Sequence, residues 1–264
     1  MLFSYSLFIE YISKKLIDKT RQLIIIIGEE LYLDIMLQRF YNNDNSSVSE
    51  LCLDEVGRGC LFGRVYVACV VLPKDPDAFD GKDIKDSKKF SSKKKLREKA
   101  EYIKANALAW HVSYAEAEKV DEINILQATM QTMHDAVKET LVKLGQPCLT
   151  SCLAVVDGNY FHSYRTFDEA NETIVEMPHV TVEQGDATFM GIAAASILAK
   201  AERDDWILGL CEEYPALQER YGMATNMGYG TAAHLAGIKE HGITQWHRRT
   251  FGQACKNAVL NEIL

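Results

Sequence analysis

The stretch LCLDEVGRGCLFGRVYVACVVLP, at residues 51–73, constrains the fold of this chain more than any other part. Its two apolar runs predict neighbouring β-strands, separated by an acidic pair and a Gly-Arg-Gly turn. Because strand side chains alternate in direction, a core that contains Leu51 and Leu53 leaves Asp54 on the opposite face. Asp54 and Glu55, beside glycines that let a ligand approach the backbone, suit a divalent cation and a phosphate. The alternative is a hairpin whose acids are solvated turn residues.

Two further aspartates follow apolar runs that predict strands. Asp157 ends LAVVD at residues 153–157, and Asp186 ends HVTVEQGD at residues 179–186. Ligands of open α/β sheets bind outside the carboxyl ends of the strands, so these acids and the first pair would converge. Clustered carboxylates with oxygen-only ligands favour magnesium or manganese over zinc. The alternative is that one aspartate belongs to a turn and the other caps the following helix.

The order of elements predicts an α/β domain with a mixed central sheet flanked by helices. Strands are expected at about residues 51–54, 64–72, 107–115, 153–158 and 179–186, and helices in the second half of 82–107, at 121–144 and at 189–210. Strands that alternate with helices after an opening hairpin are typical of this class. The residues Phe90, Ser91 and Ser92 offer a helix start.

Charge is distributed unevenly along the chain. The formal net charge is −8, which argues against a protein that coats nucleic acid by bulk attraction. Between residues 82 and 104, however, ten lysines and arginines face four acids. This segment is either a patch that contacts a phosphate backbone or a solvated helix face. Near the C-terminus, a tyrosine between glycines, Tyr229, precedes a predicted amphipathic helix and the basic run at residues 247–249. The Tyr229 ring either stacks on a sugar or base of nucleic acid or packs within the fold.

The first fifty residues differ from the rest. Their apolar run at residues 23–27 is too short to span a bilayer, and YNNDNSSVS at residues 41–49 is typical of a linker. We therefore expect an N-terminal extension and linker of unknown role (1–49), a catalytic domain (50–215) and a C-terminal helical part (216–264). The short apolar run predicts no association with a membrane. The seven cysteines form no CxxC pair, which indicates a reducing compartment, the cytoplasm.

Seven motifs, taken in order, resemble the type 2 ribonuclease H family. They are DEVGRG, DSKKFS, INILQATM, VVDGN, GDATFMGIAAASILAKAERD, NMGYGT and HGITQWHRRTF. The resemblance covers roughly residues 51–252, which leaves residues 1–35 outside it. It implies a ribonuclease H-like fold with a small C-terminal helical part. It also implies hydrolysis of the RNA in RNA–DNA hybrids and cleavage on the 5′ side of single ribonucleotides in duplex DNA, with 3′-hydroxyl and 5′-phosphate ends.

The resemblance also assigns residues. The catalytic and metal-binding carboxylates fall on Asp54, Glu55, Asp157 and Asp186. The substrate-binding residues fall on Gly57, Arg58 and Gly59 for the ribose 2′-hydroxyl, on Lys88 and Lys89 for phosphate, and on Tyr229 for stacking. Two Mg²⁺ or Mn²⁺ ions would be bound by the carboxylates, and the protein is expected to act as a monomer.

Two departures from the family pattern remove positive charge. The usual KGD is QGD at residues 184–186, and the usual NKGY is NMGY at residues 226–229. Two other functions stay open on the residues alone. A structure-specific DNA endonuclease of the same fold would need the acids but no contact with a 2′-hydroxyl. A nucleic-acid-binding protein without catalysis would need neither, although all four carboxylates argue for an enzyme.

Overall fold

The computed structural model describes residues 37–42 and 47–261. Contacts within the chain place residues 38–264 in one compact unit. The backbone of residues 38–42 is bound to this unit at two places. Gln38 pairs with Phe189, and the amides of Tyr41 and Asn42 donate hydrogen bonds to the Glu50 carboxylate. The expected extension at residues 1–35 lies outside the described residues. The domain boundaries expected near residues 49 and 215 remain predictions.

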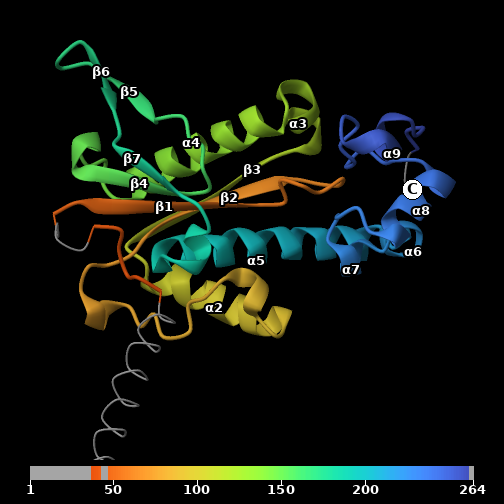
Figure 1. Cartoon of the computed structure of the whole chain (residues 1–264), viewed down its shortest axis with the longest axis horizontal. Helices are drawn as coiled ribbons and strands as arrows, with labels where there is room; N and C mark the ends of the chain where they lie inside the picture. The colour runs from red at the N-terminus through yellow and green to blue at the C-terminus, as the bar shows by residue number, and fades with distance from the viewer. Residues whose placement is uncertain (1–36, 43–46, 262–264) are drawn as a thin grey trace, which may run out of the picture. The chain divides into compact units, whose positions relative to one another are not determined.

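A five-stranded mixed sheet forms the centre of this unit (Figure 1). Its strands are β1 (Ser49–Val56), β2 (Val65–Val71), β3 (Ala109–Ala115), β4 (Cys152–Asp157) and β7 (His179–Val182). Their order is β3-β2-β1-β4-β7: β1 is antiparallel to β2, and β4 is parallel to both β1 and β7. The predicted opening hairpin and the predicted mixed sheet are therefore confirmed.

Helices cover both faces of the sheet. They are α2 (Lys93–Asn106), α3 (Ala117–Ile123), α4 (Ile125–Lys143), α5 (Met190–Glu213), α6 (Ala216–Tyr221), α7 (Met223–Asn226), α8 (Ala232–His241) and α9 (Gly252–Lys256). One face is packed by α4, and the other by α5, which α2 covers in turn (Figure 1). The four short helices after α5 gather at its carboxyl end, as the resemblance implied.

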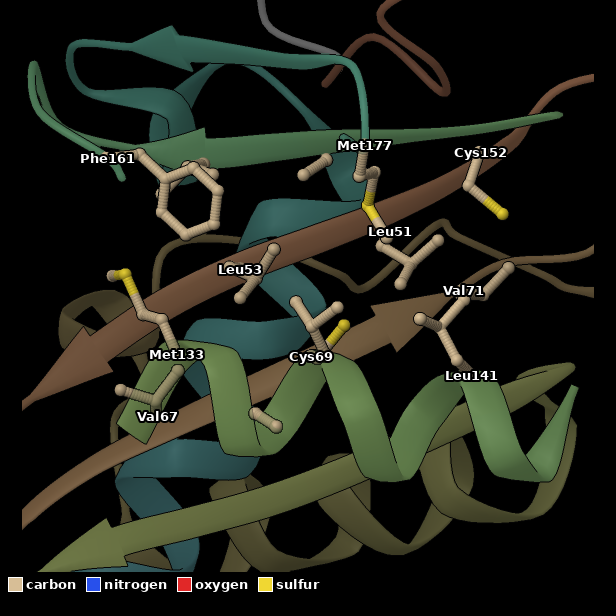
Figure 2. Close-up of a cluster of buried hydrophobic side chains, with 14 of the residues drawn as sticks. Leu51, Leu53, Val67, Cys69, Val71, Met133, Leu141, Cys152, Phe161 and Met177 are labelled. Atoms are coloured by element: carbon tan, nitrogen blue, oxygen red, sulfur yellow. The ribbon is translucent and has the colours of Figure 1, made fainter. Parts of the chain in front are cut away.

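The side chains of β1 divide between these two faces as the alternation predicted. Leu51 and Leu53 point toward α4, where Met133 and Leu141 complete a buried apolar cluster (Figure 2). Cys52 packs on the α5 face, where its sulfur lies so close to Gly191 that a β-carbon there would be 2.3 Å away. Small residues in α5 therefore let this helix approach the sheet, and Asp54 faces α5 as well.

The helix predicted at residues 121–144 is wrong in one respect. The structure divides it into α3 and α4 at Asn124, whose φ of 67° and ψ of 162° are not helical. The Asn124 side chain then accepts a hydrogen bond from the Gln127 amide and caps α4. An asparagine tolerates positive φ better than most residues, so apolar periodicity alone could not reveal this break.

The strand predicted at residues 179–186 is also shorter than expected. It ends at Val182, because Gln184 adopts a left-handed conformation (φ 56°) and the chain then enters a 3₁₀ turn, η4 (Gly185–Ala187). Asp186 thus lies on a turn after the strand rather than at the strand end. The segment between Asp157 and Asp186 adds an unpredicted hairpin, β5 (Arg165–Asp168) and β6 (Thr173–Glu176).

The C-terminal part has its own buried core, which contains two histidines. Apolar residues of α5, α6, α7 and α8 pack around Phe62 and Tyr221. His234 is 0% exposed and His247 is 1% exposed, and their Nε2 atoms are 3.0 Å apart. Burial lowers the pKa of both, and that of His247 reaches about 3. The pair is therefore neutral in the folded protein at ordinary pH.

Acidification is expected to destabilise the protein through this pair. An unfolded histidine titrates near pH 6.5, whereas His247 in the folded state titrates near 3. Between these two pH values the unfolded chain therefore binds more protons than the folded protein. The free energy of unfolding is at its full value above pH 6.5 and decreases as the pH falls toward 3. A fall from pH 6.5 to 5 should lower the free energy of unfolding by about 2 kcal/mol through this group, as measured by urea denaturation.

The His247→Gln variant, which cannot take up a proton, should lose less stability over the same interval. His241→Gln is the control for the substitution itself, since His241 is partly exposed. Equal losses in His247→Gln and in the unsubstituted protein would contradict the prediction.

Of the helices in residues 37–42 and 47–261, none is long and apolar enough to cross a bilayer. All seven cysteines are free thiols, and most of them are buried.

Candidate active site

Asp54 and Asp157 lie on adjacent parallel strands at the point where the pairing of β1 with β4 ends. The register that pairs Leu53 of β1 with Val156 of β4 places the next residue of each strand at the same edge of the sheet. Asp54 is 5% exposed, and its Oδ1 accepts a hydrogen bond from the Glu55 amide at 2.8 Å. The structure thus brings these two acids together, although only Asp157 ends its strand, because β1 continues two residues beyond Asp54 to Val56.

Asp186 joins them through the turn that follows β7. The Oδ1 atom of Asp157 accepts a hydrogen bond from the Gly185 amide at 2.7 Å, which holds η4 against the end of β4. A β-carbon on Gly185 would lie 2.5 Å from Ile192, so this position has no room for a side chain. The adjacent Asp186, 9% exposed, is thereby brought to the same edge as the two strand-end aspartates.

The electrostatics show that these carboxylates interact. Burial raises the pKa of Asp54 well above its usual range, and the charges of Asp157, Glu55 and Asp186 raise it further, against a hydrogen bond from Ser196. Burial also raises the pKa of Glu55 and of Asp157. Such a cluster is costly to ionise without a nearby cation. Glu55 meets one cation in the protein itself, at 3.5 Å from the Nη1 atom of Arg58.

Two serines that support Asp54 were not identified from the sequence. Ser196, on the buried α5, lies beside Asp54 and lowers the pKa of its carboxyl group, and the Ser196 hydroxyl lies 2.9 Å from that of Ser87. Ser87 belongs to the DSKK segment, in the 3₁₀ turn η2 (Ser87–Lys89). A serine within an alanine-rich helix is a weak signal by itself, so only the tertiary contact reveals this role.

The residues present fit a divalent cation. The donor set consists of carboxylate oxygens alone, which suits Mg²⁺ or Mn²⁺. A protein cation already lies beside it, because the Nζ atom of Lys88 is 3.6 Å from the Oδ2 atom of Asp186. Within the described residues, no three acidic, histidine or cysteine side chains are grouped closely enough to hold an ion as they stand.

Two buried arginines hold the Gly-Arg-Gly turn next to this edge. Arg248 donates hydrogen bonds from Nη1 to the carbonyl oxygens of Arg58 (2.9 Å) and Cys60 (3.0 Å), and from Nε to that of Gly63. Arg203 of α5 donates to the carbonyl oxygens of Phe62 and Met227. The hydrogen-bond acceptors of both guanidinium groups are thus backbone carbonyl oxygens and not carboxylates. Arg203 was not among the predicted site residues. Arg248 belongs to the basic run that follows Tyr229, and this run is not a surface for nucleic acid, because His247 and Arg248 are buried and only Arg249 of the run is exposed.

Tyr229 lies on the loop that Arg203 holds. Its side chain is 45% exposed, and the preceding Gly228 (φ 80°) accepts a hydrogen bond from the Leu61 amide at its carbonyl oxygen. A β-carbon on Gly228 would lie 2.8 Å from the Phe62 carbonyl oxygen, so glycine permits this close approach. The loop therefore presents an exposed ring beside the Gly-Arg-Gly turn, as a stacking role requires.

Met227 and Gln184, which stand where the family pattern has lysines, have different surroundings. Met227 is 6% exposed and packs in the C-terminal apolar core, in a left-handed conformation with φ 51°. Gln184, also left-handed, is exposed and precedes η4. Lys88 remains as the cation nearest to Asp186 among the described ion pairs.

Comparison with known proteins decides the family. The model of the ribonuclease HII family matches residues 51–254. The chain belongs to the ribonuclease HII family. A ribonuclease HII of Bacteroides thetaiotaomicron is 42% identical over 207 residues, which are 78% of this chain and 91% of that protein.

Solved structures agree at the level of the fold. Ribonuclease HII in a complex with PCNA from Archaeoglobus fulgidus has a TM-score of 0.56 at 23% identity, over 78% of this chain and 96% of that one. Bst ribonuclease HIII in complex with Mn²⁺ has a TM-score of 0.56 at 14% identity, over 81% of this chain and 70% of that one. The expected ribonuclease H-like fold is therefore confirmed.

Family membership also confirms the expected activity class. The protein is a metal-dependent ribonuclease H that cleaves RNA in RNA–DNA hybrids and excises ribonucleotides embedded in DNA. A protein that binds nucleic acid without catalysis is thereby excluded.

Proposed function

We propose that this ribonuclease HII cleaves on the 5′ side of a ribonucleotide at the edge formed by β1, β4 and η4, leaving 3′-hydroxyl and 5′-phosphate ends. The observation that supports it most is that Asp54, Asp157 and Asp186 meet at one edge of the sheet, where the charges of Asp157, Glu55 and Asp186 raise the pKa of Asp54. Asp157 and Asp186 are distant in the sequence from the adjacent pair Asp54 and Glu55, and they act on Asp54 only in the fold. These four acids are the residues that would hold two divalent cations.

The cations, when bound, would supply an activated water and neutralise charge on the phosphate, as in two-metal phosphodiester hydrolysis. The residues of the chain position the substrate. The Asp54 carboxylate accepts a hydrogen bond from the Glu55 amide, and the Asp157 carboxylate accepts one from the Gly185 amide, so both carboxylates are restrained. Restrained charged groups lower the barrier because little reorganisation is needed during the reaction.

Selection of a ribonucleotide falls to the loops beside the acids. Gly59 leaves the backbone open to a ribose 2′-hydroxyl, since a β-carbon there would meet no atom within 4 Å, and Arg58 is half exposed at the same turn. Gly57 is buried against Arg203 and supports the turn from within. Tyr229 offers a ring on which a sugar or base can stack. The 2′-hydroxyl is the group that distinguishes RNA from DNA at such a site.

The direct test uses a labelled DNA duplex that contains one ribonucleotide, and the same duplex without it. With Mg²⁺ or Mn²⁺, a single cut 5′ to the ribonucleotide is expected, and none with chelator or in the all-DNA duplex. Cleavage of the all-DNA duplex would instead support a structure-specific DNA endonuclease. Parallel assays with Mg²⁺ and with Mn²⁺ measure which of the two ions the enzyme prefers, since the carboxylates suit both.

Lys88→Met is expected to raise the KM for this substrate about tenfold, since a lysine that contacts phosphate contributes to salt-dependent affinity. The carboxylates of Asp186, Asp86 and Asp54 raise the pKa of Lys88 against the effect of burial, so the side chain stays charged. Lys89→Met removes the same charge from an exposed residue of the same turn and should have a smaller effect. The measurement is KM at two salt concentrations, and an unchanged KM in Lys88→Met would contradict the contact.

We also propose that the protein acts as a monomer in a reducing compartment, the cytoplasm. One chain contributes all four carboxylates and Tyr229, so the site needs no second copy. The free thiols of all seven cysteines support the reducing environment. The proposed substrates are RNA–DNA hybrids and duplex DNA that contains ribonucleotides.

A further inference from the structure

The buried histidine pair of the C-terminal part has neighbours that exclude water. The ring of His247 contacts Phe62 and Tyr221, each with a centroid separation of 5.0 Å. The ring of His234 lies 6.1 Å from that of Tyr221. No acidic side chain is among the hydrogen-bond partners of either histidine. The two histidines are therefore not held together by an ion pair with an acidic residue.

The hydrogen bonds leave only one arrangement of protons on the two rings. The backbone amide of Thr244 must donate, so Nδ1 of His247 accepts at 2.9 Å and the ring proton lies on Nε2. That Nε2–H donates to Nε2 of His234 at 3.0 Å. The proton of His234 must then be on Nδ1, which donates to the Tyr229 carbonyl oxygen at 2.9 Å. The chain of donors has one direction and ends at Tyr229.

The Tyr229 carbonyl oxygen has two donors, the His234 ring and the Thr231 amide at 2.8 Å. Other contacts hold the residues before it, through the carbonyl oxygens of Met227 and Gly228. His234 thus ties the peptide of Tyr229 to the core, while the buried Cys60 thiol interacts with the phenol group of Tyr229, which stays 45% exposed. Loss of the His234 hydrogen bond would free the peptide that orients the ring.

We propose that His234, oriented by His247, is a positioning residue that sets the direction of the Tyr229 ring for contact with the ribonucleotide junction. The proposal rests on the proposed function of Tyr229. Neither histidine reaches the substrate, because both are buried. The effect is therefore expected in the choice of substrate rather than in the chemistry of the carboxylates.

The test compares His234→Leu with His234→Asn. The amide nitrogen of asparagine lies where Nδ1 of histidine does and can still donate to the Tyr229 carbonyl oxygen, whereas leucine cannot. The measured quantity is the ratio of kcat/KM for a single ribonucleotide in duplex DNA to kcat/KM for a continuous RNA–DNA hybrid. We expect the ratio to fall about tenfold in His234→Leu and to be largely restored in His234→Asn. Thermal melts check that each variant is folded.

A double-mutant cycle with Tyr229→Ala separates positioning from a general effect on the fold. If His234 acts through Tyr229, His234→Leu should change the ratio no further once the ring is absent. An equal tenfold fall in both backgrounds, or no restoration by a folded His234→Asn, would overturn the proposal. So would an unchanged ratio in His234→Leu when Tyr229→Ala lowers it. An unchanged ratio in Tyr229→Ala itself would instead refute the role of Tyr229.

Discussion

Asp54→Asn is expected to lower kcat for ribonucleotide cleavage at least about a thousandfold, because it removes the central charge of the site. The side chain shape and the acceptor for the Glu55 amide remain, so the loss reports the charge. The assay is cleavage of the single-ribonucleotide duplex under saturating metal. Asp77→Asn, at an exposed acid outside the site, is the control and should cleave normally.

The same substitution should stabilise the protein in the absence of metal. Burial and three neighbouring carboxylates oppose the charge of Asp54, so its removal relieves a cost of about 1–2 kcal/mol. Thermal melts in the presence of chelator should therefore show a higher Tm for Asp54→Asn than for the unsubstituted protein. Full activity would refute the assignment of Asp54, and a lower Tm with activity lost would mean that the charge is not strained in the folded state.

Gly57→Ala is expected to destabilise the protein by about 3 kcal/mol and to lower cleavage at the ribonucleotide. The φ of Gly57 is 92°, and a β-carbon there would lie 2.3 Å from Nε of Arg203 and 2.9 Å from the Arg64 carbonyl oxygen. Arg203 would have to move, and with it the bonds that it donates to the Phe62 and Met227 carbonyl oxygens. Both the Gly-Arg-Gly turn and the Tyr229 loop would be displaced.

Gly59→Ala is the matched control within the same turn. A β-carbon on Gly59 would meet no atom within 4 Å, and its φ lies outside the left-handed region. Urea denaturation should therefore place Gly59→Ala close to the unsubstituted protein and Gly57→Ala well below it. Similar stabilities of the two variants would contradict the close packing of Arg203 on this turn.

Much of the fold could be predicted because the signals are local. The strand at residues 51–54, the pairing with residues 64–72 and the Ser92 start of α2 depend on alternation, turn glycines and a cap, which are written in consecutive residues. The break at Asn124 and the early end of β7 escaped prediction. Each depends on one residue with positive φ, and such a conformation is chosen by packing rather than by composition.

The residues themselves also determined which acids to consider and which family they resemble. They could not show how those acids are held. Ser196 and Ser87 meet across 109 residues, and Arg248 reaches the carbonyl oxygen of Arg58 across 190. Hydrogen bonds between such distant groups leave no periodic pattern in a sequence. They exist only once the sheet and α5 have placed both partners, and so the tertiary structure alone decided the geometry of the acids, the turn and Tyr229.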